Sequence, residues 1–189
     1  MIKKTLAIIA GGKSSRMGYE DKAFIRFKDK TFIDNIIEAS CDFEEIIIIS
    51  NKIEAYKNFK VFKDIYKDCG PLGGIHSALL NAKYDKVLCI ACDMPLIQKD
   101  TLNLMAKIED DYEILVPRIN DRLQPLCSIY SKDLIPEIEE ALINGKNKLQ
   151  KFILEKNYKV IDNIKYENLS LKEFSNINNK EDLKVLEGK

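Results

Sequence analysis

The sequence carries no net charge, because its 30 lysine and arginine residues balance its 30 aspartate and glutamate residues in a chain of 189. A protein without a global positive field lacks the attraction that drives general binding to nucleic acids. No apolar run approaches the roughly 20 residues that a membrane-spanning helix needs. We therefore expect neither a nucleic acid nor a membrane among the partners of this protein.

Cysteine and histidine are too few and too scattered for several kinds of chemistry. Five cysteines without regular spacing argue against a disulfide framework and favour a reducing compartment, so we expect a cytoplasmic protein. Cys89 and Cys92 form a CxxC pair, but they lie in an apolar run without a matching second pair, which favours a packed strand. His76 is the only histidine, and no Ser–His–Asp or Cys–His arrangement accompanies it. We expect this histidine in the core or on the surface.

Short apolar runs rich in branched residues alternate along the chain with longer amphipathic segments. Such runs are typical of strands buried on both faces of a parallel sheet, and the alternation predicts crossover helices. The order is less regular after Pro117, and the late strand at 124–130 is expected to depart from the parallel pattern. The sequence predicts strands at 5–10, 46–50, 60–62, 86–91, 113–117, 124–130 and 158–161, and helices at 32–39, 75–82, 101–108, 134–143 and 181–186.

These patterns predict an α/β fold with a mostly parallel central sheet. The chain shows no internal repeat, low-complexity tract or linker, so we expect one domain over residues 1–189. Its length and its apolar share of 46% suit one unit with a substantial core.

A glycine-rich segment directly follows the first expected strand. Ala10, Gly11 and Gly12 begin this segment, and Arg16 and Lys22 follow within it. Glycines let backbone N–H groups approach phosphate oxygens, and ligands of open α/β sheets lie at the carboxyl ends of strands. The segment contains neither the GxGxxG fingerprint nor a Walker A motif. It predicts a phosphate-binding loop, with a flexible turn of solvated lysines as the alternative.

A carboxylate follows the expected strand at 86–91. Asp93 lies where that buried strand ends, just before Pro95. A single carboxylate at this edge is suited to hold Mg²⁺ together with substrate phosphates. The alternative is an aspartate that only forms the turn.

A third polar segment, at residues 68–74, opens a helix. Asp68 could accept the two N–H groups of a guanine edge, since a carboxylate accepts paired hydrogen bonds. The alternative is an acidic residue that interacts with the helix dipole. Asp64 competes with Asp68 for the role of reading the base.

Together and in this order, these segments resemble the molybdenum cofactor guanylyltransferase family. Residues 9–22 read IAGGKSSRMGYEDK, similar to the family pattern LAGGxSxRMGxxDK. Segments 70–75 and 92–95 resemble its GPLAGI and CDMP motifs, and segments 124–126 and 174–183 resemble its QPL strand and FxNINTPEDL ending. The likeness covers nearly the whole chain, although Gly73 replaces a common alanine and Asn179-Lys180 replaces Thr-Pro.

The resemblance implies a three-layer Rossmann-like nucleotidyltransferase fold. It also implies a reaction in which GMP passes from GTP to the terminal phosphate of molybdopterin and pyrophosphate is released. Mg²⁺ is the implied cofactor, GTP and molybdopterin are the implied substrates, and proteins that deliver the cofactor to molybdoenzymes are candidate partners.

The same resemblance implies a role for each site residue. Arg16, Lys22 and Asp93 are expected to be catalytic, with Asp93 as the metal ligand. Asn176 and Asn178 are expected near the acceptor. The residues expected to bind the nucleotide are Ala10, Gly11, Gly12, Lys22, Asn51, Asp68 and Asp93.

Three other functions remain open on the sequence. A related cytidylyltransferase, acting on molybdopterin or on a sugar or polyol phosphate, would share the chemistry and differ in nucleotide preference. A nucleotide-binding protein without catalysis would not need Arg16, Lys22 and Asp93 together. A structural α/β domain without a ligand would leave the polar segments at three strand ends unexplained.

Overall fold

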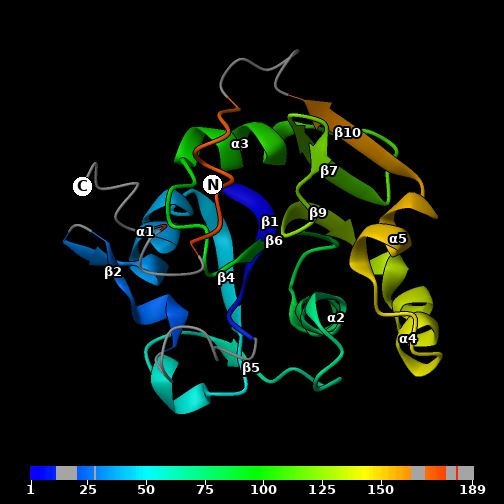
Figure 1. The fold of residues 1–189 in the computed structure, drawn as a ribbon, viewed down its shortest axis with the longest axis horizontal. Coiled ribbons are helices and arrows are strands. Elements are labelled where there is room, and N and C mark those ends of the chain that lie inside the picture. The colour runs from blue at the N-terminus through cyan, green and yellow to red at the C-terminus, as the bar shows by residue number, and fades with distance from the viewer. Residues whose placement is uncertain (12–20, 28, 163–168, 178–181, 183–189) are drawn as a thin grey trace.

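In the computed structural model, the described residues are 1–11, 21–27, 29–162, 169–177 and 182. They form an eight-stranded sheet with helices on both faces (Figure 1). Its strands are β1 (Ile2–Ile9), β4 (Phe43–Ile49), β5 (Val61–Phe62), β6 (Lys86–Ala91), β7 (Ile114–Ile119), β8 (Arg122–Leu123), β9 (Cys127–Ser131) and β10 (Tyr158–Asp162). The helices are α1 (Phe32–Ala39), α2 (Pro71–Asn81), α3 (Lys99–Lys107), α4 (Ile135–Ile143) and α5 (Leu149–Leu154).

The sheet is mostly parallel, as predicted. Its strand order is β10-β7-β9-β6-β1-β4-β5, with β8 paired to β7. Strands β5, β4, β1 and β6 pair in parallel, and β10 pairs in parallel with β7. Only the pairings of β9 and β8 are antiparallel within this described sheet. β1 therefore lies in the middle of a parallel block, and the carboxyl ends of β1, β4, β5 and β6 share one edge.

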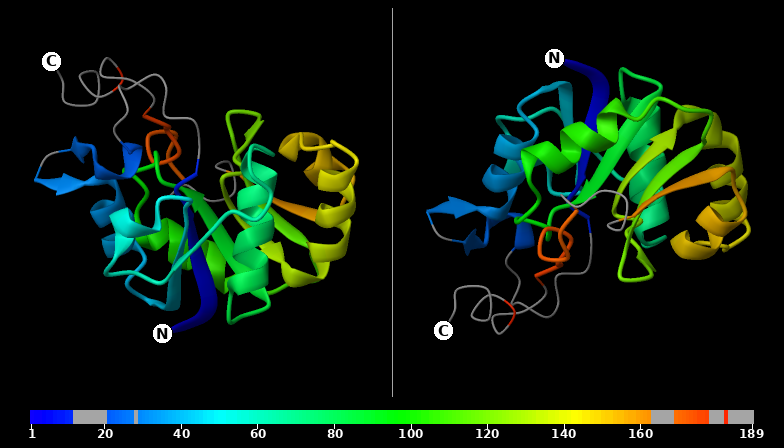
Figure 2. Two further views of the ribbon diagram at one scale, coloured as in Figure 1. Left: turned by 90° about the horizontal axis from the view of Figure 1, so that it is seen from below. Right: turned by 90° about the horizontal axis from the view of Figure 1, so that it is seen from above.

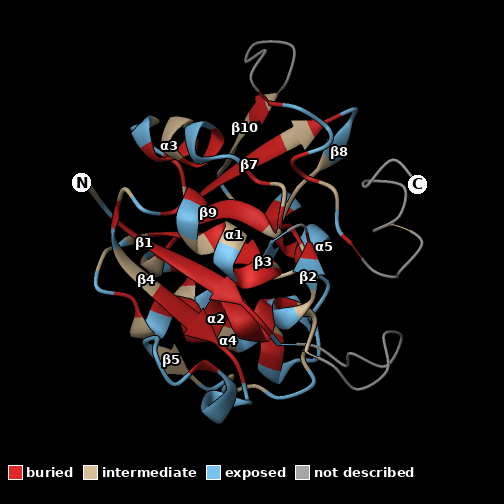
Figure 3. Cartoon of the chain, turned by 90° about the vertical axis from the view of Figure 1, so that its left-hand side faces the viewer, coloured by how far each residue is buried: buried red, intermediate tan, exposed pale blue. Residues whose placement is uncertain are grey.

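Two apolar cores lie between the sheet and the helices that pack on its two faces. Alternate residues of β1 serve opposite faces, with Leu6 and Ile8 in one core and Ala7 and Ile9 in the other. Helices α1 and α3 cover the first face, whereas α2, α4 and α5 cover the second (Figures 1 and 2). The central strands are largely buried (Figure 3), which explains their continuous apolar sequences. The predicted three-layer α/β fold is confirmed.

The strand that departs from the parallel pattern is confirmed, but it begins at Cys127 rather than at residue 124. The carbonyl of Gln124 accepts the N–H of Cys127 and the hydroxyl of Ser128, at 3.0 and 2.7 Å. The carbonyl of Pro125 accepts the hydroxyl of Tyr130 at 2.6 Å. These bonds close a turn, so the segment before Cys127 does not continue the ladder.

Several short elements were not predicted. A hairpin of β2 (Arg26–Phe27) and β3 (Lys30–Thr31) precedes α1, and α5 follows α4. Three 3-10 helices, η1 (Lys22–Phe24), η2 (Ile53–Tyr56) and η3 (Lys132–Leu134), connect larger elements of the described chain. The helix predicted at 181–186 lies outside the described residues, apart from position 182.

The described cysteines are free thiols, and the CxxC pair does not face a common site. Cys89 lies in the core beneath α2, whereas Cys92 packs against the core beneath α1 and α3. His76 is buried in α2, where its Nε2 lies 2.9 Å from Glu139 Oε1 of α4. None of the helices that the structure describes is long and apolar enough to span a bilayer.

Candidate active site

Polar residues gather along the carboxyl edge of the parallel block. Gly11 follows β1, Asn51 follows β4, Asp64 follows β5 and Asp93 follows β6. Parallel strands that are neighbours in the sheet bring their following loops together, and open α/β sheets bind ligands at this edge. The chain therefore collects, in one place, groups that are far apart in sequence.

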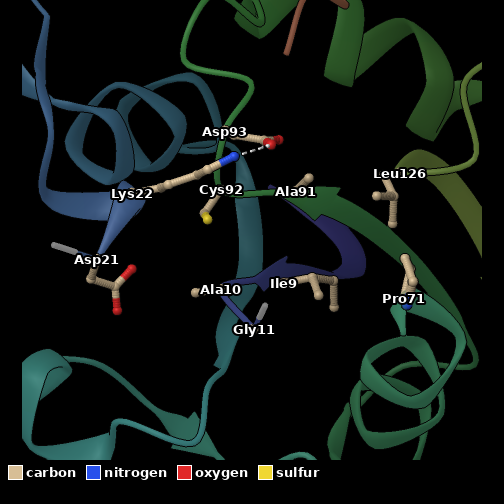
Figure 4. A pocket seen from close by; sticks show the side chains of 10 residues that line it. All are labelled: Ile9, Ala10, Gly11, Asp21, Lys22, Pro71, Ala91, Cys92, Asp93 and Leu126. Carbon is tan, nitrogen blue, oxygen red and sulfur yellow. Dashed lines mark ion pairs between the residues drawn. The ribbon is translucent and has the colours of Figure 1, made fainter. Parts of the chain in front are cut away.

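A hollow runs along this edge in two parts. Ile9, Ala10, Gly11, Asp21 and Pro71 line both parts. The first part, shown in Figure 4, is further lined by Lys22, Ala91, Cys92, Asp93 and Leu126. The second part is further lined by Ile49, Ser50, Asn51, Lys52, Asp64, Asp68, Gly70 and Gly74.

Lys22 and Asp93 form the charged centre of the first part. The Nζ of Lys22 lies 3.5 Å from Oδ2 of Asp93, and the two side chains are 19% and 18% exposed (Figure 4). Burial raises the pKa of the Asp93 carboxyl, while the positive charge of Lys22 acts in the opposite direction. The lysine thus offsets a buried negative charge whose own environment disfavours it.

The second oxygen of Asp93 fits a metal ligand. Asp93 Oδ1 is buried and has no hydrogen-bond partner, an arrangement that is costly unless a ligand satisfies the atom. Within the described ranges, no cluster of three or more His, Cys, Asp or Glu side chains could hold a metal by itself. A divalent ion at Asp93 would therefore complete its coordination with substrate phosphates and water.

Backbone hydrogen bonds fix the turn that carries Asp93. The N–H of Cys92 donates to the carbonyl of Ile9 at 3.2 Å, which ties the turn to the end of β1. The N–H of Ile177 donates to the carbonyl of Asp93 at 2.9 Å. The C-terminal segment 169–177 thereby contacts the turn that carries Asp93 directly.

The start of α2 forms one wall of both parts. Gly70 has φ +69°, a left-handed conformation that glycine adopts readily, and Pro71 occupies the first helical turn. A β-carbon added at Gly74 would lie 2.8 Å from Cγ2 of Ile9. Glycine at this position lets the helix start lie directly against the end of β1.

Asp64 and Asp68 both line the second part, but they differ in their surroundings. Asp64 Oδ1 accepts the N–H of Tyr66 at 3.1 Å and the hydroxyl of Ser77 at 3.4 Å, and burial raises its pKa. Asp68 is exposed and has φ +60°. Asp64 thus supports the loop against α2, whereas Asp68 lines the same part of the hollow and is exposed to solvent.

The remaining predicted site residues are only partly described. Among the residues predicted to bind the nucleotide, Ala10, Gly11, Lys22, Asn51, Asp68 and Asp93 line the hollow. Asn176 is exposed beside Ile177, close in sequence to the contact with Asp93. Gly12, Arg16 and Asn178 lie outside the described residues.

The structure adds residues that the sequence patterns did not select. Asp21 and Lys52 line the hollow, and Leu126 forms part of its first wall. Asp21 was visible as the neighbour of Lys22 in the glycine-rich segment, but its role depends on contacts made after folding. Ile177 is apolar and carried no signal of proximity to Asp93.

Gly11, Lys22 and the buried carboxylate of Asp93 gather where parallel strands end, the arrangement expected of an α/β enzyme that acts on phosphates. A sequence model of the family described as "MobA-like NTP transferase domain" matches residues 6–160. The chain belongs to this family and is a nucleotidyltransferase. Enzymes of this kind generally use a divalent metal.

Individual relatives agree with this assignment. A "Probable molybdenum cofactor guanylyltransferase" of Clostridium perfringens (strain 13) is 52% identical over 184 residues, covering 94% of this chain and 93% of that protein. A "Molybdenum cofactor guanylyltransferase" of Vibrio parahaemolyticus is 36% identical over 160 residues, covering 82% of each. The fold matches that of molybdopterin-guanine dinucleotide biosynthesis protein A from Archaeoglobus fulgidus, with a TM-score of 0.83 over 97% of each chain at 23% identity.

Proposed function

We propose that this protein transfers GMP from GTP to the terminal phosphate of molybdopterin and releases pyrophosphate. An oxygen of the acceptor phosphate attacks the α-phosphorus of GTP, and the bond from that phosphorus to the β-phosphate oxygen breaks. The observation that carries this proposal is the Lys22–Asp93 pair at the carboxyl edge of the sheet. The 52% identity to a protein named as a probable molybdenum cofactor guanylyltransferase supports it. Such transfers depend mainly on positioning and on stabilisation of spread negative charge.

Residues of the first part, together with Gly12 and Arg16 outside the described residues, would act on the phosphates. The backbone at Gly11 and Gly12 would hold phosphate oxygens, and Arg16 and Lys22 would stabilise charge on the transferring group and on the departing pyrophosphate. Asp93 would hold Mg²⁺, which supplies Lewis-acid stabilisation of the phosphate oxygens when bound. The unsatisfied, buried Oδ1 of Asp93 supports this assignment.

The second part of the hollow would hold the nucleoside. Asn51 would contact the nucleoside, and the carboxylate of Asp68 would accept the two N–H groups of the guanine edge. The exposure of Asp68 to solvent supports its role over that of the partly buried Asp64. On the acceptor side, Asn176 and Asn178 would contact the pterin.

We further propose that residues 1–189 act as one nucleotidyltransferase domain, because segment 169–177 packs on the core formed by the rest of the sheet. A protein that delivers the cofactor to a molybdoenzyme is a candidate partner. The free thiols of the described cysteines agree with a cytoplasmic location.

The first test is the thermal stabilisation of the purified protein by GTP, CTP, ATP and UTP, each with and without Mg²⁺. A ligand that binds only the folded state raises the apparent stability with its affinity. We expect the largest shift with GTP and Mg²⁺. A larger shift with CTP would replace the proposal with a cytidylyltransferase.

The second test follows the reaction itself. GTP labelled at the α-phosphate is incubated with molybdopterin, with and without Mg²⁺, and the label is followed by chromatography. We expect label to move to the pterin together with stoichiometric pyrophosphate. Pyrophosphate release without labelled pterin would contradict the assignment of the acceptor.

A further inference from the structure

Asp21 lies where the two parts of the hollow meet. Of the described residues that line both parts, it is the one with an ionisable side chain. A carboxylate repels the phosphates that this hollow is suited to bind, so its presence requires a compensating role. Its side chain is only 12% exposed, which indicates that its contacts lie within the protein.

One oxygen of Asp21 fixes the backbone that carries Lys22. Asp21 is the N-cap of η1, and its Oδ1 accepts the N–H of Ala23 at 3.2 Å. The backbone carbonyl of Asp21 also accepts the N–H of Phe24 at 2.9 Å. Ala23 is fully buried, so η1 is held from the core side as well. Lys22 thus extends toward Asp93 from a helical turn that the preceding residue, Asp21, caps.

The other oxygen of Asp21 faces a second lysine. Asp21 Oδ2 lies 3.8 Å from the Nζ of Lys52, which is half exposed and lines the second part of the hollow. Figure 4 shows the side chains of Asp21 and Lys22 leaving the chain in different directions. One carboxylate therefore caps the segment that carries Lys22 and pairs with the ammonium group of Lys52.

Apolar packing joins the same two segments. The rings of Phe24 in η1 and Tyr56 in η2 lie 5.0 Å apart between centroids, and Tyr56 is buried. Burial raises the pKa of the Tyr56 phenol, and the negative charge of Asp21 raises it further. The carboxylate, the ring contact and the ion pair together connect η1 with the segment that begins at Lys52.

We propose that Asp21 is a positioning residue that holds Lys22 toward the transferring phosphates and Lys52 toward the nucleoside part of the bound nucleotide. This inference rests on the proposed nucleotidyl transfer at the same site. The N-cap contact of Asp21 positions Lys22 and so affects turnover. The ion pair of Asp21 positions Lys52 and so affects the affinity for the nucleotide.

Two substitutions separate these contacts. Asp21→Asn keeps an oxygen for the N-cap and removes the charge, whereas Asp21→Ala removes both. We expect Asp21→Ala to lower kcat about fivefold to tenfold, the effect of losing one cap, and Asn to restore most of it. Both variants should weaken the binding of GTP about threefold, the size of a part-exposed ion pair.

Double-mutant cycles distinguish this role from a general loss of stability. Asp21→Ala should have no further effect on kcat in a Lys22→Ala background, and Asp21→Asn should have no further effect on GTP affinity in a Lys52→Ala background. Asp34→Ala is the matched control, because it removes the acidic member of the capping box of α1, away from the hollow. It should lower the melting temperature and leave kcat and affinity unchanged.

The two arms are measured separately, by label transfer from GTP and by calorimetric titration with GTP. Additive effects in both cycles, or a kcat for Asp21→Ala equal to that of the wild type, would overturn the inference. Absence of transfer in the wild type would instead overturn the proposed function, and the affinity cycle between Asp21 and Lys52 would still test the positioning of Lys52.

Discussion

Gly74 and Ile9 lie in such close contact that residue 74 has no room for a side chain. A β-carbon there would be 2.8 Å from Cγ2 of Ile9, a distance that real contacts do not show. This contact places the start of α2 against the end of β1. Pro71 and Ala10 consequently line the same hollow, although four strands and α1 separate them in the sequence.

Gly74→Ala should move the start of α2 away from β1. We expect a loss of stability of about 1–3 kcal/mol, typical of overpacking, and a higher KM for GTP. Gly145→Ala is a suitable control. An alanine is strained at the φ of +68° that Gly145 adopts, so this variant should also lose stability, but residue 145 does not line the hollow. Chemical denaturation and steady-state kinetics measure both effects. An unchanged KM for Gly74→Ala would show that the site tolerates the displacement.

Lys22→Ala should lower turnover far more than stability. Loss of one preorganised cation at a phosphoryl site costs about 100-fold in kcat, whereas a part-exposed ion pair contributes about 1 kcal/mol or less to folding. Because Lys22 lowers the pKa of Asp93, its removal should also raise that pKa. The acid limb of the pH–rate profile should then move to higher pH. Normal turnover in this variant would contradict the role assigned to Lys22.

Asp93→Asn should separate function from stability. Burial raises the pKa of Asp93 above 3.8, so the folded protein binds this proton more tightly than the unfolded chain. Ionisation of Asp93 therefore lowers stability as pH rises from 3.8 through the folded-state pKa. In metal-free protein at neutral pH, we expect the variant to melt no lower than the wild type. Its Mg²⁺-dependent transfer should fall at least about 100-fold.

Asp64 and Asp68 form a matched pair for testing recognition of the base. Asp68→Asn should raise the KM for GTP with little effect on melting, because an amide cannot accept both guanine N–H groups. Asp64→Ala should instead lower the melting temperature, because it removes the oxygen that accepts hydrogen bonds from Tyr66 and Ser77. If the two phenotypes were exchanged, Asp64 would be the residue that reads the base.

The sequence predicted the parallel block because its signals are local. Strands β1, β4 and β6 are buried on both faces of the sheet, which gives continuous apolar runs, whereas α1 is buried on one face, which gives an apolar stripe at helical spacing. The hairpin of β2 and β3 has only two residues in each strand, too few for a period to be read. Strand β9 began later than predicted because its first residues form a turn that carbonyl contacts stabilise.

From the residue patterns alone, the site was predictable at the segments that follow strands, and the family resemblance supplied Asn176 and Asn178. Lys22 and Asp93 were selected because each follows a buried strand, and the structure brings them to 3.5 Å. The contact between Ile177 and Asp93 is a backbone bond, which no side-chain pattern encodes. The pairing of Asp21 with Lys52 depends on η1 and η2, which long-range packing brings together.

Ile177→Val tests the link between the C-terminal segment and Asp93. Ile177 is fully buried in a small core with Phe27 and Phe32, so the change should cost about 0.5–1.5 kcal/mol. We expect a higher KM for the acceptor, because neighbouring Asn176 would lose its fixed position. Ile36→Val, a change of equal size at a buried position of α1, provides the control. It should cost similar stability and leave acceptor kinetics unchanged.

The C-terminal segment also bears on how the limits of this enzyme are drawn. The family match ends at residue 160, yet Glu173 accepts the hydroxyl of Thr101 at 2.6 Å and Ile177 reaches the Asp93 turn. A protein cut at residue 162 would keep every strand of the described sheet and lose both contacts. Boundaries taken from the family match at residues 6–160 would shorten β1 and β10 and would also remove the segment that contacts the turn of Asp93.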